Sequence, residues 1–66
     1  MTDLHVREEP ATVLVVDDAP ATRYIVGSWL RRDGFQVIEA GTGGEALSLL
    51  HAQPVDIVVL DVGLPD

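Results

Sequence analysis

Three apolar runs divide the chain into segments of similar length. They cover residues 12–16, 35–40 and 55–60, and β-branched residues are frequent in the first and third. Short, almost continuous apolar runs are typical of strands that are buried on both faces of a parallel sheet. The middle run is more mixed, which favours a strand nearer an edge of the sheet. We therefore expect three strands, of which the first and third have the more buried character.

The segment after the first run has the pattern of an amphipathic helix. Asp18 is a suitable N-cap residue, and Pro20 fits the first helical turn. Gly34 is expected to end this helix in a left-handed conformation. Apolar residues recur at the spacing of one buried helix face, which predicts core positions at Ile25, Val26, Trp29 and Leu30.

A second helix is predicted between the middle and last runs. Thr42 and Glu45 have the spacing of a capping box, and Pro54 ends the segment. The glycines of "GTGG" at 41–44 lack the spacing of a phosphate-binding loop, so they are interpreted as a helix start. His51 is expected to be solvated near the helix end. The predicted buried face consists of Ala46, Leu47, Leu49 and Leu50.

The alternation of strand and helix indicates an α/β fold with a doubly wound parallel sheet. Residues 12–66 are expected to form one domain. Residues 1–11 are polar and acidic and end near Pro10, so we expect them to be a disordered lead-in.

Composition narrows the classes of function. The 66 residues carry a formal net charge of −7, with four arginines and no lysine, which opposes a general affinity for nucleic acid. An acidic chain favours cations or basic partner surfaces instead. No cysteine is present, so neither a disulfide nor a thiolate metal site is expected. Without a recognisable signal peptide or an apolar run long enough to span a membrane, we expect a cytoplasmic chain.

Carboxylates directly follow the first and third predicted strands. Asp17 and Asp18 come after the first, and Asp61 comes after the third. The carboxyl ends of parallel strands share one edge of the sheet, where ligands bind in open α/β folds. If these strands are neighbours, the three side chains converge, and three carboxylates need a hard cation such as Mg²⁺. Helix capping by the acidic pair and a turn role for Asp61 are the alternatives.

Three other acidic residues are assigned simpler roles. Asp56 and Asp66 are expected at a strand start and in a turn. Glu39, near the end of the second strand, is a further candidate for the border of the cation site.

Taken together, four motifs resemble the receiver domain of two-component response regulators. They are "VLVVDD", "LRRDGFQV", "EALSLL" and "PVDIVVLDVGLPD", and the resemblance covers residues 12–66. It implies a flavodoxin-like strand order of 2-1-3-4-5, in which the first and third strands are neighbours. It also implies that Asp61 accepts a phosphoryl group from a histidine kinase, as an aspartate nucleophile can. By resemblance, Mg²⁺ is bound by Asp18, Asp61 and the backbone carbonyl of Gly63, with Asp17 acting through a water.

The resemblance extends to the N-terminal half of a receiver, a β-α-β-α-β unit of order 2-1-3. The Ser or Thr and the Lys that end the fourth and fifth strands of receivers have no counterpart in the 66 residues. The third strand is then expected to be an exposed apolar edge, which favours self-association. We expect a regulatory domain of a response regulator or a hybrid kinase, not an enzyme. The sequence identifies neither the output domain nor the kinase.

Two other functions compete with this one. A Mg²⁺-dependent phosphohydrolase can also use an aspartate nucleophile, but haloacid-dehalogenase-like enzymes carry a second Asp where this chain has Gly63. A non-phosphorylated interaction fragment would bind through its third strand. The intact set of acidic residues argues against a degenerate receiver, but it does not bear on a truncated one.

Overall fold

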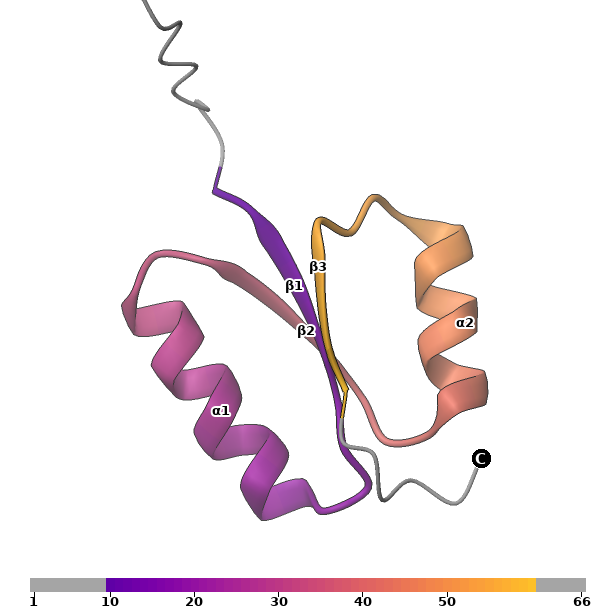
Figure 1. Ribbon diagram of the computed structural model, residues 1–66, viewed down its shortest axis with the longest axis horizontal. Coiled ribbons are helices and arrows are strands. Elements are labelled where there is room, and N and C mark those ends of the chain that lie inside the picture. Colours follow the sequence, from indigo (N-terminus) through magenta and orange to yellow (C-terminus); the bar gives the residue numbers. More distant parts are fainter. Residues whose placement is uncertain (1–9, 61–66) are drawn as a thin grey trace, which may run out of the picture.

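The computed structural model describes residues 10–60 of the chain (Figure 1). Within them, five elements follow one another: β1 (Thr12–Val16), α1 (Pro20–Arg32), β2 (Gln36–Ala40), α2 (Gly43–Ala52) and β3 (Ile57–Leu60). The predicted element order is confirmed. Both β2 and β3 begin slightly later than the apolar runs that predicted them.

The strands form a parallel sheet in which β1 is central and the order is β2-β1-β3. Val16 at the end of β1 pairs with Ala40 of β2 and with Leu60 of β3, so the described strands end at the same level. The two helices lie on opposite faces of the sheet (Figure 1). The predicted doubly wound, flavodoxin-like arrangement and the strand order 2-1-3 are therefore confirmed, as is the edge position of the second strand.

The core is built around β1, because its central position buries both of its faces. Residues 13–16 are each at most 2% exposed. Their side chains alternate between the two faces, as in any strand. Leu14 and Val16 form a cluster with Ala40 and with Ala46 of α2. Partly buried residues complete this cluster, namely Ile38, Leu49 and Val55.

The helix ends agree in part with the capping predictions. Gly34 has φ +98°, the left-handed conformation expected after α1. At the start of α2, the Glu45 N–H donates to Thr42 Oγ1 at 3.0 Å, which confirms Thr42 as the N-cap. The Glu45 carboxylate accepts from the N–H of Gly41 rather than from that of Thr42 itself. This second bond ties the β2–α2 connection to the first turn of the helix.

The prediction that Trp29 lies in the core is wrong, since its side chain is 62% exposed. The buried residue of α1 is Gly27, where an added Cβ would lie 3.5 Å from Val37 Cγ1. The helix therefore approaches β2 closely through a residue without a side chain. Among the described elements, α1 contacts β1 and β2 alone. Ile25, which was also expected in the core, is 46% exposed, so that prediction is wrong as well.

A similar correction applies to α2 and to β3. Leu47 and Leu50 were expected in the buried face, but they are 59% and 40% exposed. All four residues of β3 are exposed, so the expected buried character of the third strand is wrong, whereas its expected place as an exposed apolar edge of the partial receiver is confirmed. Within residues 10–60, α2 contacts β1 and β2 but not β3, so neither element covers the other.

Asp56 has the predicted role at a strand start. Its N–H donates to the Thr12 carbonyl at 2.9 Å, and its carboxylate accepts from the Thr12 N–H at 2.7 Å. This reciprocal pair joins the beginning of β3 to the beginning of β1. It helps to fix the register that brings the carboxyl ends of both strands to the same level.

Candidate functional site

The carboxyl edge of the sheet is the candidate site. Asp17 follows β1 directly, and its N–H donates to the Ala40 carbonyl at 3.1 Å, which holds it against the end of β2. Leu60, the partner of Val16, precedes Asp61 in the sequence. Asp61, Gly63 and Asp66 lie outside the described residues, so their predicted roles stay predictions.

Asp17 is a buried carboxylate with a defined partner. Its residue is 8% exposed, and Oδ1 accepts from the Ala19 N–H at 2.9 Å. Ala19 is the N-cap residue of α1, so the carboxylate lies at the positive end of the helix dipole. A backbone donor and a helix N-terminus both compensate the loss of water around a buried charge.

Asp18 does not cap α1, and that prediction is wrong. The N-cap residue is Ala19, which makes no side-chain capping bond, and Asp17 supplies the acceptor instead. The helix begins one residue later than capping by Asp18 requires. Asp18 is exposed at the end of the sheet. The two adjacent acidic residues therefore differ: one is buried and hydrogen-bonded, and the other faces solvent.

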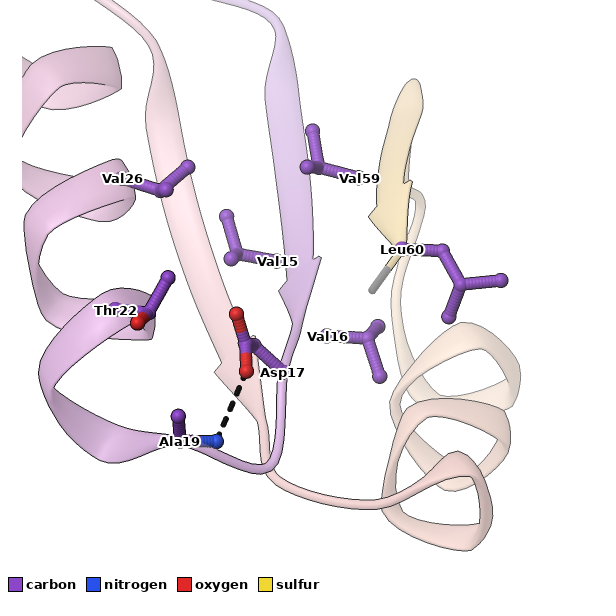
Figure 2. Close-up of a pocket in the computed structure, with 8 residues that line it drawn as sticks. All are labelled: Val15, Val16, Asp17, Ala19, Thr22, Val26, Val59 and Leu60. Carbon is purple, nitrogen blue, oxygen red and sulfur yellow. Dashed lines mark hydrogen bonds between the residues drawn. The ribbon is translucent and has the colours of Figure 1, made fainter. Parts of the chain in front are cut away.

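A pocket of about 350 Å³ opens beside Asp17. Figure 2 shows Asp17 at its base, between β1 and the first turn of α1, with one oxygen directed toward Ala19. Asp17 is the charged residue of the lining, and Thr22 of α1 adds a hydroxyl group. The other lining residues are apolar, namely Val15, Val16, Ala19, Val26, Val59 and Leu60. Among the described lining residues, the polar groups that face this pocket are the Asp17 carboxylate and the Thr22 hydroxyl.

The donor chemistry of the acidic pair fits Mg²⁺. Carboxylate oxygens are the hard ligands that this ion takes, usually one or two per site together with waters. Among residues 10–60, no group of three or more His, Cys, Asp or Glu side chains could hold a metal. In the predicted site, Asp17 and Asp18 would be the carboxylates from the described residues, and the third would be Asp61.

Glu39 has another role than the one considered for it. Its carboxylate forms ion pairs with two arginines of α1, through Arg23 Nε and Arg31 Nη2, each at 3.3 Å. Arg23 also donates from Nη1 to the backbone carbonyl of Asp17 at 2.8 Å. This contact was not predicted from the sequence. Two glycines leave room for these side chains, Gly27 inside α1 and Gly41 before α2, but the sequence alone does not show what fills that room.

The glycine-rich segment before α2 is a helix start, as predicted. Its residues form the capping arrangement of Thr42 and Glu45 described above. His51 is exposed in the last turn of α2, which confirms the prediction for it. Neither feature contributes to the carboxyl edge of the sheet.

The fold and this edge define a class: an α/β protein with acidic residues where parallel strands end. Comparison with known families gives the particular one. The model of the response regulator receiver domain matches residues 13–66. The chain therefore belongs to the receiver domain family of two-component response regulators.

Similar proteins agree with this assignment. The chain is 47% identical over 58 residues to the probable transcriptional regulatory protein TcrX of Mycobacterium tuberculosis, covering 88% of this chain and 25% of that protein. It is 34% identical to the protein PilH of Pseudomonas aeruginosa, covering 83% and 46%. It is 44% identical to a cyclic di-GMP phosphodiesterase of Thermotoga maritima, covering 82% and 14%.

The chain spans about a quarter of the length of the first two of its curated relatives, 25% and 26%. The names of the relatives include transcriptional regulators and a phosphodiesterase. For this chain, the similarity supports a regulatory domain. In the part that the structure describes, neither helix is long and apolar enough to cross a membrane.

Proposed function

We propose that this receiver domain accepts a phosphoryl group from a histidine kinase on Asp61. Mg²⁺ would be held by Asp18, by Asp61 and by the backbone carbonyl of Gly63, with Asp17 acting through a bound water. The observation that carries the proposal is the register of β1 and β3. Val16 and Leu60 are paired, and the next residues in the sequence are Asp17 and Asp61.

The transfer would convert a phosphohistidine of the kinase into an aspartyl phosphate. One carboxylate oxygen of Asp61 forms a bond to phosphorus while the bond between phosphorus and the histidine nitrogen breaks. The histidine nitrogen keeps the electron pair and takes up a proton. A bound Mg²⁺ would neutralise the carboxylates and the phosphoryl oxygens. The exposed position of Asp18 suits a direct ligand, and the buried, hydrogen-bonded Asp17 suits a contact through water.

The partners in this proposal are a histidine kinase and an output domain or effector, in a response regulator or a hybrid kinase in the cytoplasm. We also propose that residues 12–66 are the receiver portion, following a lead-in at 1–11. In addition, the exposed strand β3 would bind a second copy of the 66-residue chain. Support for this last point is that β3 is an edge strand with four apolar, exposed residues. An edge strand without charged side chains can pair with the same strand of a second copy, because no like charges repel each other.

The metal site is tested with Mn²⁺, which prefers the same oxygen ligands and is followed by the resonance of the free ion in electron paramagnetic resonance. Asp18→Ala is expected to weaken Mn²⁺ binding by roughly tenfold or more, since even partners of metal ligands have effects of about that size. Asp33→Ala, at another exposed carboxylate at the end of α1, is the control and should leave the affinity unchanged. Equal affinity in both variants would contradict the metal assignment.

A further inference from the structure

We infer that Arg23 is a positioning residue for the acidic pair. Its Nη1 donates to the backbone carbonyl of Asp17 at 2.8 Å. This carbonyl belongs to the planar peptide unit that joins Asp17 to Asp18, so its direction fixes how the two residues are turned relative to each other. The inference rests on the proposed function, because the pair is oriented for the divalent cation proposed there.

Arg23 can act in this way because its own guanidinium is held. Nε forms an ion pair with Glu39 Oε1 at 3.3 Å, and the two side chains are 22% and 28% exposed. The other oxygen of Glu39 accepts from Arg31, whose side chain is 48% exposed. The planar fork of an arginine offers donors in fixed directions. Arg23 therefore connects two parts of the sheet edge: Nη1 binds Asp17, after β1, and Nε binds Glu39 of β2.

Two glycines make room for this arrangement. A Cβ at Gly41 would lie 3.0 Å from Arg23 Nη1, and a Cβ at Gly27 would lie 3.3 Å from Glu39 Oε2. Glycine is an unfavourable residue inside a helix such as α1. Close packing against a charged side chain gives a physical reason for it there. The guanidinium is thus enclosed between the end of β2 and α1.

Position and charge predict opposite effects of Arg23 on a bound cation. A positive charge next to the acidic pair repels a divalent ion, so electrostatics alone predicts that loss of Arg23 strengthens binding. Without the hydrogen bond to the Asp17 carbonyl, the peptide unit between Asp17 and Asp18 is free to move. Cation binding must then also fix this peptide unit, which costs free energy. The positioning role therefore predicts weaker binding.

Gly41→Ala separates these effects, since it changes no charge. Gly41 does not have a positive φ, so the substitution disturbs the guanidinium without straining the backbone. Its matched control is Gly44→Ala, where the one described atom near an added Cβ is Thr42 Oγ1 at 4.0 Å. Arg23→Lys keeps the charge but has one nitrogen for two acceptors. Its control is Arg31→Lys, because Arg31 contacts Glu39 but not Asp17.

Mn²⁺ affinity of the 66-residue chain is measured by paramagnetic resonance. Hydrogen exchange at the Ala19 amide, which bonds Asp17 Oδ1, is measured without metal. Gly41→Ala and Arg23→Lys are expected to weaken Mn²⁺ binding by about tenfold, the scale of changes in partners of metal ligands, and to speed this exchange. Both controls should behave like the unaltered chain. A purely structural role would lower thermal stability without changing the affinity of the folded fraction.

The outcomes are distinguishable. If the unaltered chain binds Mn²⁺ and the Gly41 and Arg23 variants bind it equally well or more tightly, the positioning role is overturned and the proposed function stands. If the controls lose as much affinity as their counterparts, the positioning role is overturned as well. If the unaltered chain does not bind Mn²⁺, the proposed function fails, and the inference fails with it.

Discussion

The two adjacent carboxylates should differ in their effect on stability. Asp17→Ala removes the acceptor of the Ala19 N–H, whereas Asp18→Ala removes an exposed side chain. A hydrogen bond to a charged group contributes about 1.5 to 3 kcal/mol. Because Ala19 is half-buried and water can replace part of the bond, we expect a value near the lower limit, about 1.5 kcal/mol. Asp17→Asn keeps an acceptor oxygen, so it should lose less stability than Asp17→Ala.

The difference between the two variants isolates this bond. Each substitution relieves the same repulsion between neighbouring charges, so that contribution cancels in the comparison. A chain of this length is expected to have a free energy of unfolding of about 3 to 10 kcal/mol, so the effect is a measurable fraction. Urea unfolding is followed by circular dichroism at one low protein concentration. A difference between Asp17→Ala and Asp18→Ala below about 0.5 kcal/mol, the usual scatter of surface substitutions, would refute the reasoning.

Three further predictions concern the fold. Leu14→Ala, at a fully buried position, should lower the free energy of unfolding in urea by about 3 kcal/mol, and Leu47→Ala, at an exposed position, by less than about 1 kcal/mol. Similar losses in both variants would contradict the observed core. The 66-residue chain should associate in sedimentation at increasing concentration, and Ile57→Lys in the exposed strand β3 should reduce this association; a monomer at all concentrations would exclude pairing through β3. Gly34→Ala should lose about 1 kcal/mol because of its φ of +98°, whereas Gly44→Ala should lose none; equal values would argue against the left-handed helix end.

The strands and their order could be predicted from the sequence to a large extent. Apolar runs between helical segments indicate a parallel sheet, and the more mixed run indicated an edge. The resemblance to receiver domains further predicted that the first and third strands are adjacent in the sheet. The apolar pattern could not predict how far each helix face is buried by the elements packed against it. Trp29 fits the apolar stripe of α1, but Gly27 provides the closest approach to the sheet. How far a stripe is buried depends on what packs over it.

The acidic pair could be located from the sequence, but its division of roles could not. Asp17 and Asp18 offer the same carboxylate oxygens to the same helix start. Which of them accepts the N–H depends on the residue at which α1 begins, here Pro20 after the N-cap Ala19. The contact from Arg23 to the Asp17 carbonyl involves a backbone atom, which leaves no pattern of residue types.

The long-range ion pair was hidden for a different reason. Arg23 and Glu39 are sixteen positions apart, on a helix and on an edge strand. Their meeting depends on the crossing of α1 over β2, and the sequence spacing carries no information about that crossing. The space left by glycines on both sides becomes meaningful only when the elements are in place.

The most direct test of the central claim is phosphoryl transfer to Asp61. The full reading frame that contains these 66 residues is expressed and incubated with Mg²⁺ and acetyl phosphate, and the product is analysed by mass spectrometry. We predict one phosphoryl group that hydroxylamine removes, located in the peptide that contains Asp61 and lost in Asp61→Asn. Undiminished labelling of Asp61→Asn, or a phosphoryl group on another residue, would contradict the account.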